Sequence, residues 1–256
     1  MNTSFYKGLD PLLIASGQYK GPDLPPPLSR GRIFADYGTM VRHSANEILQ
    51  LRSEVPGRIM VNIGGTQNAG KSTLTRNLME LLPSMGLEDI IHFSEDFSLQ
   101  PMNEVFGWER SDPSKFEDVR GSWFRWPVVH EFLEYFTDPA TTTFNIRDVL
   151  NRDDNVTLTD RTFNLTDNTV LLYDGVFGFD TNHYPKGFDH SVFLYTGFET
   201  AIQRSLSKGR ERVREIHGKC FIPSHISYRA EYDPQTKANT VIDTNDFARL
   251  QMLIYR

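Results

Sequence analysis

Five short stretches of the chain combine a high density of apolar residues with flanking turn residues. Runs of this kind are typical of strands that are buried in a sheet. The segments between them are long enough to hold helices, which favours crossover connections and parallel pairing. The pattern therefore predicts an α/β fold with a mainly parallel, five-stranded sheet flanked by helices. The predicted strands are residues 59–63, 89–93, 169–173, 190–195 and 239–242.

A helix is predicted directly after the first strand, because its leucines recur at helical spacing. Leu74, Leu78, Leu81 and Leu82 belong to this pattern, and Pro83 is expected to end the helix.

Two further helices are predicted from their start signals. Ser44 and Glu47 have the spacing of a capping box, which predicts a helix over about 45–53. Pro127 is suited to the first turn of another helix. Residues 138–168 are rich in Thr, Asn and Asp, which indicates a loop or a short hairpin.

The chain begins with a proline-rich extension. Residues 21–32, GPDLPPPLSRGR, cannot sustain a helix and are expected to be extended. We therefore divide the chain into an N-terminal extension, residues 1–35, and one domain, residues 36–256.

Composition narrows the function classes. The hydrophobic content of 39% and the charged content of 23% are those of a globular protein. The net charge of −6 argues against a nucleic-acid or membrane-surface binder, since each needs a basic surface. Cys220 is the only cysteine, so no intrachain disulfide is expected. Neither a signal peptide nor an apolar run long enough to cross a bilayer is evident, and we predict a cytoplasmic protein.

The turn after the first strand carries a phosphate-binding motif. Gly65, Gly70, Lys71 and Ser72 fit G-x-x-x-x-G-K-[ST], and the motif stands between a strand and a helix, as it requires. The glycines let the backbone approach a phosphate, which backbone N–H groups and the helix N-terminus attract. Lys71 would reach the outer phosphates, and the Ser72 hydroxyl would hold Mg²⁺. The predicted ATP-binding residues of this loop are Gly65, Thr66, Gln67, Asn68, Ala69, Gly70, Lys71, Ser72 and Thr73.

Acidic residues follow two of the predicted strands. In an open α/β sheet, ligands bind beyond the carboxyl ends of the strands. Glu95 and Asp96, after the second strand, are therefore candidates for the carboxylate that takes a proton from an acceptor hydroxyl. The alternative is a helix N-terminus, where acids are favoured by the dipole. Asp174 follows the third strand, where P-loop proteins place a second, often water-mediated, contact to Mg²⁺.

Residues 108–126 are rich in aromatic and charged side chains, and their pattern assigns no secondary structure. The aromatic side chains would either line an acceptor pocket or pack in the core, which is their commoner use.

The most basic segment lies between the fourth and fifth predicted strands. Arg204, Lys208 and Arg212 are spaced as one stripe of a helix, in which like charges repel unless an anion bridges them. A triphosphate would be such an anion, so residues 204–220 are a candidate lid over ATP. The alternative is a solvated surface helix, and Gly209 weakens the stripe. The candidate phosphate contacts are Arg204, Lys208, Arg210 and Arg212.

Taken in order, these motifs resemble the uridine kinase and nicotinamide riboside kinase group of small-molecule kinases. The resemblance covers roughly residues 58–242 and is thin between the motifs. Asp174-Gly175 stands where the family usually has Glu-Gly. The other segments that carry the resemblance are Gly64-Gly65, Asn68 to Leu74, Asn77-Leu78, Leu82-Pro83, His92 to Phe97, and Pro223, Tyr228, Arg229 and Glu231.

The sequence departs from the family pattern at the proposed chemistry. The pattern after the second strand is Asp, any residue, Phe. Anchored on Phe97, the catalytic position is Glu95, with Asp96 in the middle, so the base is Glu95 by register or Asp96 by a shift of one residue. Asp174 in place of Glu shortens the reach to Mg²⁺, which a water would span. The lid lacks the family's tight arginine cluster.

The motifs and the resemblance together predict an ATP- and Mg²⁺-dependent kinase that phosphorylates a hydroxyl of a small acceptor. Lys71 would neutralise charge at the phosphates, and Glu95 or Asp96 would activate the acceptor. The resemblance suggests a nucleoside, with nicotinamide riboside first and uridine or cytidine second. The rival interpretation is a nucleotide-binding regulatory module without transfer. A GTPase is disfavoured because the chain has no Asn-Lys-x-Asp motif.

Overall fold

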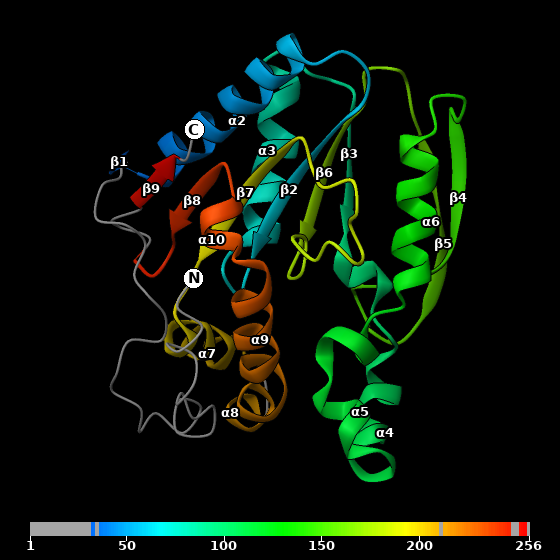
Figure 1. Ribbon diagram of the computed structural model, residues 1–256, viewed down its shortest axis with the longest axis vertical. Helices are drawn as coiled ribbons and strands as arrows, with labels where there is room; N and C mark the ends of the chain where they lie inside the picture. The colour runs from blue at the N-terminus through cyan, green and yellow to red at the C-terminus, as the bar shows by residue number, and fades with distance from the viewer. Residues whose placement is uncertain (1–31, 34–35, 210–211, 247–250, 255–256) are drawn as a thin grey trace.

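The computed structural model describes residues 32–33, 36–209, 212–246 and 251–254 of the 256-residue chain. Its centre is a seven-stranded sheet in the order β1-β9-β8-β7-β2-β6-β3, with helices on both faces (Figure 1). Five of these strands are parallel and coincide with the five predicted strands, which confirms the predicted fold class. They are β2 (Ile59–Gly65), β3 (Ile90–Ser94), β6 (Val170–Gly175), β7 (His190–Tyr195) and β8 (Thr240–Asp243).

Two strands that the sequence analysis does not predict extend the sheet beyond β8. β9 (Gln251–Ile254) is antiparallel to β8, and β1 (Arg32–Ile33) is antiparallel to β9. β1 belongs to the predicted N-terminal extension, of which residues 1–31 lie outside the described residues.

Side chains on both faces of the central strands are buried. On one face, Val61 of β2 and Leu172 of β6 pack with α2 (Tyr37–Glu54) and α3 (Lys71–Ser84). On the other face, Tyr173 of β6 belongs to a second, aromatic-rich cluster. Parallel strands that are covered on both sides form continuous apolar runs, which is why the sequence pattern identified them.

The helix before the first strand begins at Tyr37, and the predicted start at residue 45 is wrong. Asp36 is the N-cap of α2, and its carboxylate accepts a hydrogen bond from the backbone N–H of Thr39 at 2.7 Å. Ser44, the predicted capping residue, is buried in the middle of the helix. The helix that was predicted over 45–53 therefore forms as the second half of a longer one.

The other predicted elements form close to their expected bounds. α3 ends at Ser84, so Pro83 lies in its last turn rather than beyond it. α6 (Trp126–Thr137) begins at the predicted proline signal. β4 (Thr143–Leu150) and β5 (Leu158–Asn164) make an antiparallel hairpin, one of the two expected outcomes for that segment.

None of the described helices is long and apolar enough to span a bilayer.

Two groups of short helices lie beyond the carboxyl ends of the parallel strands, below the sheet in Figure 1. The first group is η2 (Glu95–Ser98), α4 (Met102–Ser111), α5 (Pro113–Glu117) and η3 (Val119–Trp123). The second group is α7 (Phe198–Ser207), α8 (Val213–Ile216), η4 (His217–Phe221) and α9 (Ile222–Tyr232). After it, α10 (Pro234–Lys237) lies beside β7 (Figure 1).

Candidate active site

The turn between β2 and α3 has a tightly constrained backbone. Gly65 has a φ of +150°, and a Cβ built on it would lie 2.6 Å from the backbone oxygen of Leu194 in β7. Gly70, the N-cap of α3, has a φ of +100°. Both positions favour glycine for these reasons. Residues 66–70 then lead into the N-terminus of α3, where free N–H groups and the helix dipole favour an anion.

Gly65→Ala is expected to lower the free energy of unfolding by about 1–3 kcal/mol, because the new Cβ would meet the backbone of β7. Urea denaturation followed by circular dichroism measures this loss. Gly64→Ala is the matched control, since a Cβ there meets the Phe179 ring at a milder 3.3 Å. Equal stability of the two variants would contradict the steric account.

Lys71 is the first residue of α3. Its Nζ donates a hydrogen bond to the backbone oxygen of Thr66 at 2.9 Å, which folds the side chain back over the loop. Burial lowers the pKa of Lys71, while the charges of Asp96, Asp174 and Glu95 oppose this change. The loop therefore places one amino group in the field of three carboxylates.

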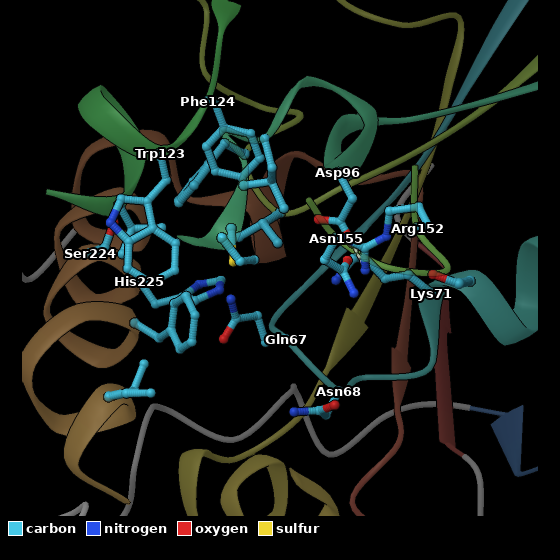
Figure 2. A pocket seen from close by; sticks show the side chains of 18 of the residues that line it. Gln67, Asn68, Lys71, Asp96, Trp123, Phe124, Arg152, Asn155, Ser224 and His225 are labelled. Atoms are coloured by element: carbon cyan, nitrogen blue, oxygen red, sulfur yellow. Dashed lines mark ion pairs between the residues drawn. The ribbon is translucent and has the colours of Figure 1, made fainter. Parts of the chain in front are cut away.

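A cavity of about 630 Å³ lies between this loop and the two groups of short helices. Figure 2 shows Lys71, Asp96 and Arg152 at one end of it and Trp123 and His225 at the other. The glycine and the polar residues that line it are Gln67, Asn68, Gly70, Lys71, Ser72, Thr73, Asp96, Arg152, Asn155, Lys208, Arg212, Ser224 and His225. Its apolar lining comprises Leu99, Met102, Phe106, Val119, Trp123, Phe124, Val176, Phe177, Ile216 and Phe221.

The aromatic segment 108–126 contributes side chains both to the cavity lining and to the core. Trp123 and Phe124 line the cavity, whereas Phe116 is buried against Trp123 in the core. The ring centroids of Trp123 and Phe221 are 5.1 Å apart in an edge-on arrangement, so the two groups of short helices meet at this wall.

The two acids after β3 occupy different environments. Asp96 lines the cavity, and its Oδ2 lies 3.0 Å from an NH2 nitrogen of Arg152. Glu95 is fully buried and is absent from the described lining of the cavity. Its carboxylate accepts hydrogen bonds from the backbone N–H groups of Val176 and Phe177, and from the hydroxyl of Tyr184 at 2.9 Å. Glu95 therefore anchors the turn after β6, while Asp96 faces the cavity.

Burial raises the pKa of Glu95 to about 7, although its hydrogen bonds act in the opposite direction. The pKa of Glu95 is therefore higher in the folded protein than in the unfolded chain. As the pH rises from the unfolded pKa to 7 and above, the contribution of this carboxyl to the stability of the fold decreases. Replacing it by Gln removes this titration. The stability of Glu95→Gln relative to wild type is therefore expected to improve by about 2 kcal/mol between pH 5.5 and pH 8. Urea denaturation at both pH values measures this difference; a difference that does not change with pH would contradict it.

Asp174 is held at the end of β6 by two neighbours on β3. The Ser94 hydroxyl donates to Oδ1 of Asp174, and Nε2 of His92 lies 3.3 Å from its Oδ2. Burial opposes ionisation, but His92, Ser94 and the charge of Lys71 lower the pKa of Asp174. Ser72, the other predicted metal-binding residue, lines the cavity directly. A serine hydroxyl and an ionised carboxylate are hard oxygen donors of the kind that Mg²⁺ prefers.

The predicted basic stripe does not form one helix. α7 ends at Ser207, Gly209 has a φ of +67°, and Arg212 has a φ of +52° before α8. Arg204 and Lys208 instead contact the phosphate-binding loop, donating to the backbone oxygen and the Oδ1 of Asn68 at 3.1 and 3.0 Å. Lys208 and Arg212 line the cavity. Arg210 lies outside the described residues.

Arg212 joins the lid to the opposite group of short helices. Its guanidinium donates to both carboxylate oxygens of Glu109 in α4, at 2.9 and 2.5 Å, and also to Glu215 at 2.9 Å. The ion pair between Arg212 and Glu109 therefore links the two groups of short helices that border the cavity.

Among the polar residues that line the cavity, sequence reasoning missed four: Arg152, Asn155, Ser224 and His225. Arg152 and Asn155 come from the tip of the β4–β5 hairpin, and the backbone oxygen of Asn155 accepts from the N–H of Met102 at 2.9 Å. No motif marks this tip in the sequence; only the hairpin prediction placed a turn there. His225 stands between Pro223 and Tyr228, which the resemblance did include.

Comparison with known proteins gives likeness in structure alone. No protein-family profile matches the chain, and no curated protein matches its sequence. The structure of a possible uridine kinase from Bacillus stearothermophilus is 19% identical, with a TM-score of 0.58, over 78% of this chain and 96% of that one. D-glycerate 3-kinase from Cryptococcus neoformans var. grubii is 12% identical, with a TM-score of 0.59, over 84% of this chain and 99% of that one.

One of these structures is described as a possible uridine kinase and the other as a D-glycerate 3-kinase, and each is covered almost in full. At these identities the likeness concerns the arrangement of strands and helices. Together with the five parallel strands and the loop before α3, it shows that this chain has the fold of the P-loop kinases.

Proposed function

We propose that this protein is an ATP-dependent kinase that transfers the γ-phosphoryl group to a hydroxyl of a nucleoside. The observation that carries the proposal is a cavity with different ends. The loop of the phosphate-binding motif and the carboxylate of Asp96 lie at one end, and aromatic rings line the other. ATP would bind with its phosphates on residues 65–73, close to Lys71. The acceptor would occupy the aromatic end and direct its hydroxyl toward Asp96.

The described residues contain no group of three acidic, histidine or cysteine side chains that would hold a metal ion. Mg²⁺ usually binds through one or two protein oxygens, phosphates and waters, so Ser72 and Asp174 fit it without such a cluster. Asp174, whose oxygens already bind Ser94 and His92, would act through a water. Bound Mg²⁺ would neutralise charge that develops on the transferring phosphoryl group.

The residues of this chain then divide the work of transfer. Asp96 would accept the proton of the acceptor hydroxyl, and Arg152 would hold its carboxylate in place. Lys71 would stabilise the developing charge at the phosphates. Lys208 and Arg212 would close the site from the lid, after Arg212 leaves Glu109.

The lining of the aromatic end supports a nucleoside over an anionic acceptor such as glycerate. Trp123, Phe124 and Phe177 supply apolar surface and ring faces on which a planar base would stack. The cationic side chains that line the described cavity are Lys71, Arg152, Lys208 and Arg212, and Figure 2 places Lys71 and Arg152 at the polar end. Arg212, the lid cation that pairs with Glu109 of α4, already has its guanidinium bound to two carboxylates, those of Glu109 and Glu215.

The test is ADP release from Mg-ATP with a panel of acceptors: nicotinamide riboside, uridine, cytidine, D-glycerate, pantothenate and ribulose 5-phosphate. Strong stimulation by a nucleoside alone is the expected result. Stimulation by D-glycerate would reject the nucleoside and keep the kinase. Stabilisation of the fold by ATP without turnover of any acceptor would favour the nucleotide-binding module.

A further inference from the structure

The hairpin of β4 and β5 brings an arginine to the end of the cavity where transfer would take place. Arg152 lines the cavity from the tip of this hairpin, and Figure 2 shows it at the same end as Asp96 and Lys71. Its Nη2 lies 3.0 Å from Oδ2 of Asp96. Burial lowers the pKa of Lys71, and the positive charge of Arg152 acts in the same direction. Arg152 therefore lies near both the candidate base and the lysine of the phosphate-binding motif.

The tip that carries Arg152 is a hydrogen-bonded turn. The backbone N–H of Asn151 donates to the backbone oxygen of Thr157, and that of Asn155 donates to the backbone oxygen of Asn151, both at 2.8 Å. The backbone oxygen of Asn155 also accepts from the N–H of Met102, which ties the tip to α4. The backbone that carries Arg152 is thus fixed, and the ion pair with Asp96 orients its side chain. Such a charge is preorganised before the substrate arrives.

The described cations of the predicted lid are engaged with other groups of the protein. Their partners are Asn68 and Thr244 for Arg204, Asn68 for Lys208, Glu109 and Glu215 for Arg212, Glu199 for Arg214, and Glu215 for Lys219. These contacts occupy donors that a phosphate would otherwise use. Arg152 pairs with Asp96 through one nitrogen. Because a guanidinium has five N–H donors in a planar fork, it can bind a carboxylate and a phosphate oxygen at the same time.

Phosphoryl transfer creates a need for such a group. The acceptor oxygen forms a bond to the γ-phosphorus while the bond from that phosphorus to the bridging oxygen of ADP breaks. The hydroxyl proton passes to Asp96, and ADP leaves with the electron pair of the broken bond. Charge is meanwhile spread over the three non-bridging oxygens of the transferred group.

We propose that Arg152 donates to one of these non-bridging oxygens while it holds Asp96, and that the hairpin thereby supplies a catalytic arginine from outside the lid. The group in transfer must pass between the acceptor hydroxyl at Asp96 and the phosphates at Lys71, and Arg152 is near both. This inference rests on the proposed kinase function.

The experiment measures the binding of a mimic of the transferred group. Aluminium fluoride with Mg-ADP forms a negatively charged complex in place of the γ-phosphoryl group, and calorimetry in the presence of the best acceptor gives its affinity. Arg152→Ala is expected to weaken this binding by about 10²-fold, because the contact is made to charge that ADP alone does not carry. The affinity for ADP alone should stay within about twofold of wild type.

A matched control is available on the same hairpin. Arg147→Ala removes a charge at an exposed position of β4 that is outside the described lining of the cavity, and it should behave as wild type. Because the side chain of Arg152 is 39% exposed, its loss should leave the protein folded, which thermal unfolding checks. Arg152→Lys keeps the charge without the planar fork and is expected to recover part of the lost affinity.

A second measurement separates direct contact from a role through Asp96 alone. If Arg152 only holds the base, its removal should cost nothing once the base has been removed. In the Asp96→Asn background, Arg152→Ala is instead expected to lower kcat by about a further tenfold.

The outcomes separate this inference from the proposed function. If wild type phosphorylates an acceptor and Arg152→Ala binds the aluminium fluoride complex as tightly as wild type, the contact is wrong while the kinase stands. The same holds if aluminium fluoride does not tighten the binding of ADP to wild type, or if Arg152→Ala costs nothing in the Asp96→Asn background. If wild type neither binds a nucleotide nor phosphorylates any acceptor, the proposed function and this inference fall together.

Discussion

Lys71→Ala is expected to reduce phosphoryl transfer by roughly a thousandfold, the loss typical of removing a preorganised charge from a reacting centre. Lys71 lies in the field of Asp96, Asp174 and Glu95. Without the Lys71 ammonium group, the charge of these carboxylates is less compensated, although Arg152 still pairs with Asp96, and the carboxylates would repel the triphosphate. Both effects act in the same direction, so affinity for ATP should fall together with kcat.

The measurement is ADP release from Mg-ATP with the best acceptor of the panel, beside the binding of ATP alone. Lys237→Ala, at an exposed position at the end of α10, removes the same charge far from the loop and should keep full activity. Turnover of Lys71→Ala at a tenth of the wild-type rate or more would reject the assignment of residues 65–73 as the phosphate site.

Asp96→Asn is expected to lower kcat by about 10²–10⁴-fold, the usual contribution of a positioned general base. The amide keeps the size of the side chain but cannot take a proton, and its contact with Arg152 loses one charge. KM for ATP should change little, because Asp96 is assigned to the acceptor hydroxyl.

Glu95→Gln is the matched comparison, because it makes the same change from acid to amide at the neighbouring residue. Its amide oxygen can still accept from the N–H groups of Val176 and Phe177, so kcat is expected to stay within about tenfold of wild type. The reverse result is a large loss of kcat in Glu95→Gln and a small loss in Asp96→Asn. It would identify Glu95 as the base, as the register of the family pattern predicts. Wild-type rates in both variants would reject base catalysis from this turn.

The five parallel strands could be predicted because burial on both faces gives each a dense apolar run. The start of α2 could not, because Ser44 satisfies a local capping pattern and is nevertheless buried by packing in the folded chain. Local spacing records which residues can cap a helix, and only the tertiary arrangement decides which one does. β9 and β1 are short and lie at one edge of the sheet, where the hydrophobic pattern of a strand is weakest.

The residues of the candidate site also divide into those that the sequence could predict and those that it could not. The proposed phosphate-binding loop, residues 65–73, is contiguous in sequence, so a motif can mark it. The choice between Glu95 and Asp96 depends on backbone N–H groups of Val176 and Phe177, more than seventy residues further along the chain, which the motif does not include. Arg152 and His225 reach the cavity from separate segments. No motif marks the segment of Arg152, and the segment of His225 carries part of the resemblance, in which His225 itself is not included.

All three tryptophans of the chain, Trp108, Trp123 and Trp126, lie within one short segment, residues 108–126. Trp108 packs against the ammonium group of Lys115, Trp126 stacks on His183, and Trp123 lines the cavity itself. The tryptophan fluorescence of this protein therefore originates entirely in residues 108–126, where one of the three indoles lines the cavity. An acceptor that stacks there should change the emission of Trp123, which would let its binding be titrated in unlabelled protein, without nucleotide and without turnover.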